Sequence, residues 1–319
     1  MKKSGNLALG PAAVSDEWGD RRPEKLSPAI VVVQDSLSAV LHIATVHYQS
    51  PRWIDIQARY LRENIAVPYQ TWSSIEAIDR SYASRFDHVL EQRGPHAGKL
   101  NQLAREICHV GADDDLIMFL DGDAFPIADP MPLISESLER APLVAVRRAE
   151  NLDEPQPHPC FCVTTVRTWR GVRGDWSLGY PWRSAAGRTI SDVGGNLLRA
   201  LELSDTPWVQ IQRTNETDVH PVFFGIYGDT IYHHGAGFRD AFVTRADRER
   251  LRKRLATQNT AARWAKRGRD LVLRRPWNHD TNERIRLQSE SIFQAIARGD
   301  EAWLAMMRSD AHEARISPR

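Results

Sequence analysis

Between residues 39 and 146, short apolar runs alternate with amphipathic stretches. The apolar runs predict buried strands, because they are brief and bounded by polar or turn-forming residues; they cover residues 39–46, 67–72, 116–120 and 143–146. The stretches between them repeat apolar side chains at helical spacing, which predicts helices over residues 51–61, 96–108 and 130–138. Strands that alternate with helices in this way predict an α/β sheet with crossover connections.

Beyond residue 151 the pattern is less regular. A loop-rich stretch with many Gly, Arg and Trp residues covers 170–188. Short strands are predicted at 161–166, 208–212 and 230–233, a helix at 193–203, and further helices from residue 246 onward. The chain is therefore expected to comprise a flexible N-terminal arm (1–27), an α/β domain (28–243) and a helical C-terminal extension (244–319).

The composition is that of a globular protein. The 319 residues are 42% hydrophobic and include 10 Trp, 9 Phe and 7 Tyr, enough apolar surface for a large core. No apolar run reaches the roughly 20 residues that a membrane helix needs, and residues 4–20 lack the apolar stretch of a secretory leader. Three cysteines without framework spacing (Cys108, Cys160 and Cys162) favour a reducing compartment. A cytoplasmic protein is therefore expected.

Charge is balanced overall but unevenly distributed. The chain has 42 Lys+Arg and 41 Asp+Glu, and residues 244–319 hold 18 of the former and 10 of the latter. An acidic body with a basic tail is not typical of a nucleic-acid-binding protein, whose positive charge lies across its binding face. A solvated helical face accounts for the basic tail, so no nucleic-acid partner is expected.

Two carboxylates follow the predicted strand at 116–120, separated by one glycine: Asp121, Gly122 and Asp123. In open α/β sheets, ligands bind at the carboxyl ends of the strands. Aspartates at positions i and i+2 can bind one hard cation, and a glycine between them lets a phosphate approach the backbone. The motif indicates either a magnesium-type site open to a phosphorylated ligand or a simple turn after a strand.

Four segments carry a family resemblance when their order and spacing are taken together. They are residues 45–53 (TVHYQSPRW), 98–101 (GKLN), 119–126 (FLDGDAFP) and 232–239 (YHHGAGFR). With these segments the chain resembles the GT-A glycosyltransferases, family 2 members in particular. The resemblance implies a Rossmann-like mixed sheet flanked by helices. It also implies transfer of a hexosyl or related sugar from a nucleoside-diphosphate donor to a small-molecule or glycan acceptor, with Mn2+ or Mg2+.

The resemblance further implies roles for individual residues. Asp121 and Asp123 would bind the metal, and His233 or His234 would complete its coordination, with His233 favoured by strand alternation. The donor-binding residues that it implies are Thr45, His47, Tyr48, Lys99, Asn101, Asp121, Gly122 and Arg239. For Thr45, His47 and Tyr48 the alternative is packing at a strand end. For Lys99 and Arg239 the alternative is a position on the solvated surface.

An inverting transferase also needs a carboxylate that accepts the proton of the acceptor. Asp192, just before a predicted helix, is the candidate, and Asp175 is the reserve. The acidic pair usual in the family is missing here, a retaining enzyme needs neither residue, and Asp192 would serve equally as a helix N-cap. Trp169, Trp176 and Trp182 are candidates for the acceptor wall, with burial in the core as the alternative.

Two other functions fit parts of the sequence. A haloacid-dehalogenase-like phosphohydrolase also has Asp-x-Asp after an apolar strand, but near the start of its domain and with Thr or Val where this chain has Phe125. A non-catalytic sugar-nucleotide-binding protein would have the fold without turnover. A zinc site built on Cys160 and Cys162 is rejected, because the two alternate across a strand and lack a second pair. The C-terminal helices are expected to pack on the domain, cap the acceptor site or form a homodimer.

Overall fold

The computed structural model of the protein describes residues 39–184, 187–215, 220, 222–235, 237 and 279–308. The predicted arm at 1–27, the predicted helical stretch between 246 and 271, and Arg239 lie outside these residues. None of the helices within the described ranges is long and apolar enough to cross a lipid bilayer.

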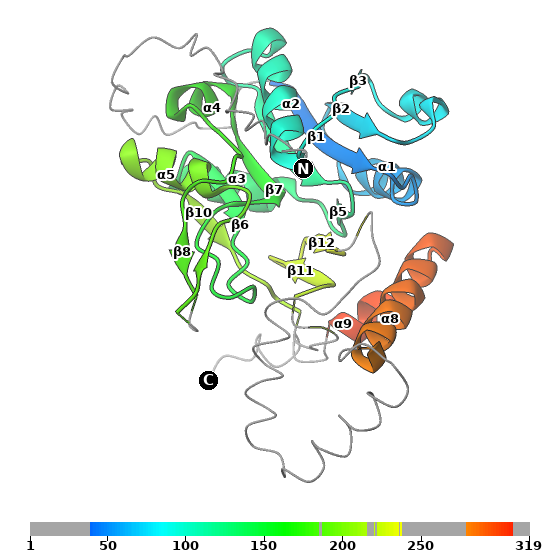
Figure 1. Cartoon of the computed structure of the whole chain (residues 1–319). Coiled ribbons are helices and arrows are strands. Elements are labelled where there is room, and N and C mark those ends of the chain that lie inside the picture. The colour runs from blue at the N-terminus through cyan, green and yellow to red at the C-terminus, as the bar shows by residue number, and fades with distance from the viewer. Residues whose placement is uncertain are drawn as a thin grey trace, which may run out of the picture.

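A seven-stranded mixed sheet forms the centre of the structure (Figure 1), with the strand order β10-β6-β7-β4-β1-β2-β3. Its strands are β1 (Leu41–Tyr48), β2 (Tyr69–Glu76), β3 (His88–Leu90), β4 (Leu116–Asp121), β6 (Leu143–Val146), β7 (His158–Thr165) and β10 (Val209–Ile211). β1 is parallel to β2 and β4, whereas β7 is antiparallel to β4 and β6. The predicted α/β class, with a mixed sheet flanked by helices, is confirmed.

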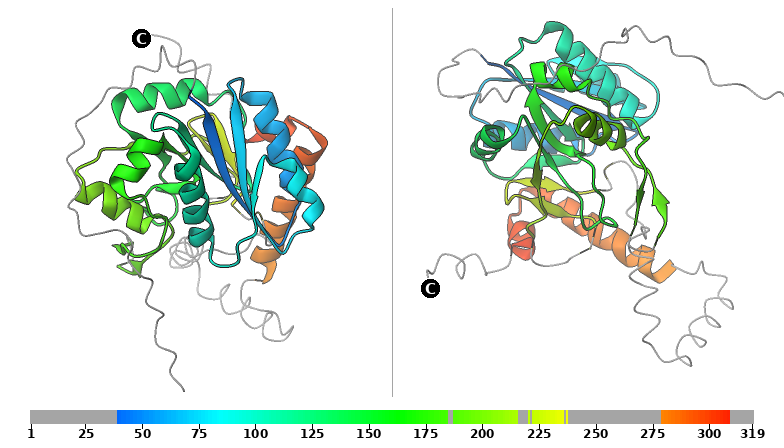
Figure 2. Two further views of the ribbon diagram at one scale, coloured as in Figure 1. Left: turned by 90° about the horizontal axis from the view of Figure 1, so that it is seen from above. Right: turned by 90° about the vertical axis from the view of Figure 1, so that its left-hand side faces the viewer.

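Helices cover both faces of this sheet (Figure 2). They are α1 (Ile54–Asn64), α2 (His96–Val110), α3 (Met131–Arg140), α4 (Val166–Val172) and α5 (Gly195–Leu203). The short 3-10 helix η1 (Arg80–Arg85) has no buried residue and is joined to α1 by the Arg85–Asp55 ion pair. Phe119 packs in a core with α2, α4 and α5, and its neighbour Met118 packs in another with α1 and α3. Successive side chains of β4 enter different cores because they alternate along a strand, and a strand covered on both faces is apolar throughout.

A smaller sheet and the C-terminal helices complete the described structure (Figure 1). The smaller sheet consists of β11 (Gly225–Tyr227), β12 (Ile231–His233) and β5 (Ala124–Pro126), and the C-terminal helices are α8 (His279–Arg298) and α9 (Ala302–Met307). β8 (Trp182–Arg183) and β9 (Thr189–Ile190) form a separate hairpin. Ile292 and Trp303 of the C-terminal helices share a core with Phe125 and Tyr232. The described part of the extension therefore packs on the domain, while the homodimer stays a prediction.

The long elements lie within a few residues of their predicted positions, and two local expectations need correction. α1 begins at Ile54 rather than Pro51, with Trp53 at its N-cap. α4 occupies residues that were partly expected to be loop, because the Thr165 side chain accepts a hydrogen bond from the Thr168 N–H and caps it. A helix of seven residues is too short for its apolar spacing to be distinctive.

Candidate active site

A cleft of about 410 Å³ opens at the carboxyl ends of β1 and β4. It is lined by Val46, His47, Tyr48, Ser50, Trp53, Gly94, Pro95, His96, Lys99, Asp121, Gly122, Asp123, Arg148, His158, His233, Gly235 and Gly237. This edge of the sheet is where an α/β fold places a ligand, because the loops that follow parallel strands meet there. The Asp-Gly-Asp motif therefore faces a cleft rather than bulk solvent.

Strand register brings the acidic motif next to His233. β4 ends at Asp121, and β5 then pairs antiparallel with β12, so that Ala124 lies opposite His233. The His234 N–H donates to the carbonyl oxygen of Asp123 at 3.0 Å and extends this pairing. As a result, His233 Nε2 lies 3.5 Å from Asp123 Oδ1 and 3.6 Å from Asp121 Oδ2.

These three side chains suit a hard divalent cation. Their ligand atoms lie within 4.8 Å of one another, and all three residues are buried. Asp121 Oδ1 accepts no hydrogen bond from a described residue, although it lies 3.3 Å from His96 Nε2. A buried carboxylate oxygen without a donor is costly unless a cation neutralises it. Two carboxylates and one imidazole are ligands that fit a divalent metal ion.

Burial and pairing act in opposite directions on the ionisable groups of the cleft. Burial alone would raise the pKa of Asp123, but the charge and hydrogen bond of His233 outweigh it and hold that pKa well below its usual range. Burial lowers the pKa of His47 to about 4, against the hydrogen bond that it donates to Gln57 Oε1 and the charge of Asp123. At neutral pH the cleft thus presents an ionised Asp123 and a neutral His47.

Gln57 of α1 fixes both the acidic motif and the end of β1, although nothing in the sequence singled it out. Its side-chain amide donates to the carbonyl oxygens of Asp121, at 2.9 Å, and Ala124, at 2.7 Å. Its Oε1 lies 3.1 Å from Thr45 Oγ1 and 3.2 Å from His47 Nε2. Gln57 is only 1% exposed. A glutamine on the buried face of a helix is the signal that could have revealed it, because buried amides need partners.

Other residues that line the cleft are basic. His96 is the first residue of α2, and Lys99 follows in the first turn. Lys99 is buried, with its Nζ 2.5 Å from Glu76 Oε2 and 4.5 Å from the centre of the Tyr48 ring. Arg148, after the carboxyl end of β6, also lines the cleft. Helix N-termini and cations attract anions, so an anionic ligand is favoured beside the acidic group.

The structure places most of the predicted donor- and metal-binding residues in this cleft. They are His47, Tyr48, Lys99, Asp121, Gly122, Asp123 and His233. Thr45 does not line it; its hydroxyl bonds Gln57 and faces a second pocket of about 290 Å³ beside α1. Gly122 has no room for a side chain, because a Cβ there would lie 2.5 Å from the carbonyl oxygen of Val46.

His234 is turned away from the cleft. Its Nδ1 lies 2.9 Å from the Tyr232 hydroxyl, and its Nε2 lies 2.8 Å from Ser289 Oγ on α8. Both ring nitrogens therefore have partners, and burial lowers the pKa of His234 to about 3. Of the two neighbouring histidines, His233 is the one beside the carboxylates, because side chains alternate along β12.

Asp175 and Asn101 meet each other away from the cleft. Asp175 Oδ1 accepts hydrogen bonds from Asn101 Nδ2 at 2.6 Å and from the Ser177 N–H at 2.9 Å. Asp175 Oδ2 accepts a bond from Asn196 Nδ2 at 3.0 Å. Asn101 Oδ1 in turn accepts the Trp176 N–H at 2.8 Å. This network joins α2, the loop after α4 and the start of α5, which is a structural arrangement.

We expect Asp175→Ala to lower the free energy of unfolding by about 1–3 kcal/mol, because three donors lose a charged acceptor. Burial raises the pKa of Asp175, but the bonds from Ser177, Asn196 and Asn101 outweigh it, so that pKa is lowered. The stabilisation is therefore present at neutral pH and is lost as pH falls through the lowered pKa. Denaturant unfolding should separate variant and wild type less in acid than at neutral pH. Unchanged stability with lost activity would instead indicate a catalytic Asp175.

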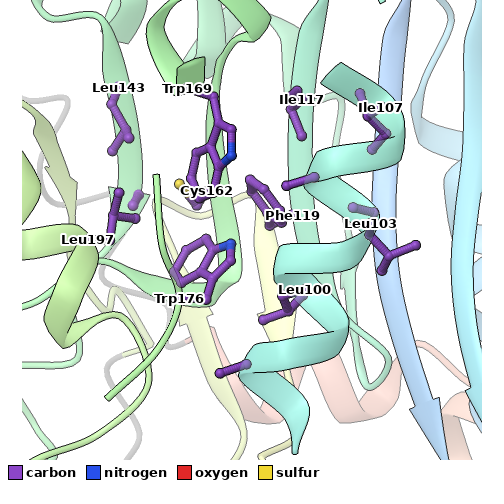
Figure 3. Packing of buried hydrophobic residues seen from close by; sticks show 14 of the residues in the cluster. Leu100, Leu103, Ile107, Ile117, Phe119, Leu143, Cys162, Trp169, Trp176 and Leu197 are labelled. Carbon is purple, nitrogen blue, oxygen red and sulfur yellow. The ribbon is translucent and has the colours of Figure 1, made fainter. Parts of the chain in front are cut away.

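The remaining candidates lie outside the lining of the cleft. Asp192 is exposed, and its carboxylate accepts the N–H of the adjacent Val193; it is not the predicted cap of α5, because the N-cap is Gly194 and no side chain caps this helix. Trp169 and Trp176 are 5% and 0% exposed and lie in the core shown in Figure 3, where they pack beside Phe119. Trp182 is half-buried in β8. Burial in the core, rather than an acceptor wall, describes the first two tryptophans.

Sequence reasoning also missed three cationic or imidazole side chains of the cleft: His96, Arg148 and His158. His96 opens a predicted helix, and Arg148 follows a predicted strand by two residues. Both positions are at the ligand-binding edge of an α/β sheet, so their place in the pattern was an available signal. His158 opens β7, whose start was predicted three residues too late.

No model of a protein family matches this sequence, and no curated protein is significantly similar to it. Among solved structures, the chain is similar to TarS from S. aureus, with 10% identity and a TM-score of 0.33, over 43% of this chain and 30% of that one. It is also similar to the mannosyltransferase PcManGT from Pyrobaculum calidifontis, in complex with GDP-Man and Mn2+. Here the identity is 14% and the TM-score 0.32, over 43% of this chain and 47% of that one. The chain is also similar to the glycosyltransferase GlyE from Streptococcus pneumoniae, with 12% identity and a TM-score of 0.31, over 41% of this chain and 35% of that one. The chain thus spans less than half of each of these proteins, and likeness at this level assigns no activity.

Proposed function

We propose that this protein is a metal-dependent glycosyltransferase of the GT-A type, which moves a sugar from a nucleoside-diphosphate donor to an acceptor. One observation carries the proposal: Asp121, Asp123 and His233 converge in a cleft that also holds the N-terminus of α2 and Lys99. A diphosphate bridged to a divalent ion requires both a ligand set for the ion and positive charge for the remaining phosphate oxygens.

The ligand set and the helix N-terminus have different tasks in this proposal. Asp121, Asp123 and His233 would hold Mn2+ or Mg2+, which when bound supplies Lewis-acid stabilisation of the charge on the leaving diphosphate. Lys99 and the free N–H groups of α2 would bind the phosphates from another side. Tyr48, held under Lys99, is the candidate to pack against the donor base.

No catalytic base is assigned among the described residues. The lining of the cleft offers Asp121 and Asp123 as its carboxylates, and both are committed to the metal. Asp192 would need to approach the cleft to serve as the base of an inverting reaction. The donor sugar is expected to be a hexose or a related sugar, and a cytoplasmic location remains our expectation.

A donor screen tests the proposal most directly. We expect one nucleoside-diphosphate sugar to stabilise the protein against heat only when Mn2+ or Mg2+ is present, because the ion joins the diphosphate to the carboxylates. A ligand at about 100 times its Kd adds about 2.7 kcal/mol, a rise in Tm on the order of 5 °C for a chain of this size. Release of the nucleoside diphosphate with an acceptor mixture, and its loss on adding EDTA, would then measure turnover.

Other outcomes of the same screen would replace the proposal. Stabilisation by a donor without turnover on any acceptor would indicate the sugar-nucleotide-binding protein. Release of inorganic phosphate from simple phosphomonoesters, with no donor bound, would indicate the phosphohydrolase. Equal stabilisation with and without a divalent ion would contradict the metal-bridged diphosphate.

A further inference from the structure

A second group of metal-binding side chains lies against the acidic one. It consists of His158, Cys160 and His233, whose ligand atoms lie within 4.8 Å of one another. The two imidazole rings have centroids 5.6 Å apart. We call these three residues the Cys160 cluster. It shares His233 with the acidic group, which also contains Asp121 and Asp123.

The strand geometry explains why the Cys160 cluster faces the carboxylates. His158 and Cys160 are two residues apart in β7, so their side chains point to the same face. β7 is antiparallel to β4 with Phe119 opposite Cys162, and the same register continued by two residues places Cys160 beside Asp121. The pairing of β6 with β7 shifts by a bulge after Ala145, and bulges beside active sites redirect side chains.

Both ring nitrogens of His158 have a neighbour in the described structure. Arg148 Nη1 lies 3.3 Å from His158 Nε2, and the Cys160 N–H donates to His158 Nδ1 at 3.1 Å. His158 Nδ1 lies 4.0 Å from Asp121 Oδ2, so a metal bound at Nδ1 would take the place of the Cys160 N–H.

Cys160 supplies the one soft ligand. It is fully buried. A buried thiol is inert unless a cation stabilises its thiolate. His233 Nε2 and His158 Nδ1 lie 3.6 Å and 4.0 Å from Asp121 Oδ2, which can serve as a fourth ligand. Two imidazoles, a thiolate and a carboxylate form a set that zinc binds tetrahedrally.

We propose that the Cys160 cluster, with Asp121, is a binding site for Zn2+ or another borderline-soft divalent ion. On binding, a metal–sulfur bond forms and the Cys160 thiol proton passes to water, with no change of oxidation state. Because His233 and Asp121 belong to both groups, one ion at a time can be bound, and Zn2+ would exclude Mn2+ or Mg2+. Binding itself is independent of the proposed transfer reaction, whereas inhibition by Zn2+ rests on it.

Cobalt(II) is the probe that tests the site, because a thiolate bound to Co2+ gives a charge-transfer band in the near ultraviolet. We expect the full-length protein to show this band on titration with Co2+ and to lose it when Zn2+ is added. Cys160→Ala should abolish the band, whereas Cys108→Ala, which removes a half-buried thiol on α2, should retain it. No band in the wild type, or a band that survives Cys160→Ala, would overturn the proposal.

A second variant covers the case in which Cys160→Ala does not fold. His158→Gln keeps the thiol and is expected to weaken Co2+ binding at least about tenfold, as loss of a supporting group does at other metal sites. Circular dichroism and Tm confirm that each variant is folded. If transfer activity is found, Zn2+ should inhibit the Mn2+-activated wild type more strongly than Cys160→Ala. Equal inhibition of both would place the inhibitory ion elsewhere.

Discussion

Replacing Asp123 by asparagine is expected to reduce transfer by about 10³-fold or more, because an ion that stabilises the leaving group loses a ligand. Asp123 is 7% exposed, and its Oδ1 lies 3.5 Å from His233 Nε2. The amide has nearly the shape of the carboxylate, so the packing against β12 should persist. Initial rates of nucleotide release at saturating donor, together with the Mn2+ concentration that gives half of the maximal rate, measure the effect.

Asp114→Asn is the matched control for this variant. Asp114 is an exposed aspartate in the loop before β4, where its Oδ1 accepts a bond from Arg167 at 3.0 Å. We expect this change to leave the rate and the Mn2+ requirement unaltered, since exposed ion pairs contribute about 1 kcal/mol or less to stability. Circular dichroism should show both variants folded. A rate for Asp123→Asn within tenfold of wild type would contradict the role of Asp123 in metal binding.

The order of the main elements could be predicted from the sequence because each one has a strong local signal. β4 is apolar from Leu116 to Leu120 because both of its faces are covered, and α2 carries Leu100, Leu103 and Ile107 at helical spacing. β12 was predicted at 230–233 and forms at Ile231–His233, whereas β5 was not predicted. Its three residues are too few to show a period, and it exists by pairing with β12, which is a long-range property.

In the candidate site, too, residues with a local sequence signal could be predicted, whereas roles that depend on long-range contacts could not. Asp121 and Asp123 could be proposed because they follow a recognisable strand, and the fold brings His233 beside them. Asn101 and Asp175 could not be separated from ligand-binding residues by sequence, because their role depends on where their side chains point. A zinc site on Cys160 and Cys162 was rejected because the two alternate across a strand and lack a second pair, whereas the fold brings His158 and His233 to Cys160.

Replacing Trp176 by alanine is expected to lower the free energy of unfolding by about 3–5 kcal/mol, as other large-to-small changes in protein cores do. The side chain is fully buried, and its ring centroid lies 5.0 Å from that of Phe119 and 5.8 Å from that of Trp169. Figure 3 shows Trp176 among the side chains of α2 and of the sheet, so its removal leaves a cavity. Urea unfolding monitored by circular dichroism measures the loss.

The contrast with Trp182→Ala decides between a core role and an acceptor wall. Trp182 is half-buried, and its Nε1 lies 3.4 Å from the carbonyl oxygen of Leu152. Its replacement should cost less than that of Trp176, because Trp182 is partly exposed and lies in a strand of two residues. If Trp176 is a core residue, the folded fraction of Trp176→Ala retains the KM of wild type for the acceptor. An acceptor KM raised tenfold or more with unchanged stability would instead show that Trp176 contacts the acceptor, as only a residue at the surface of the cleft can.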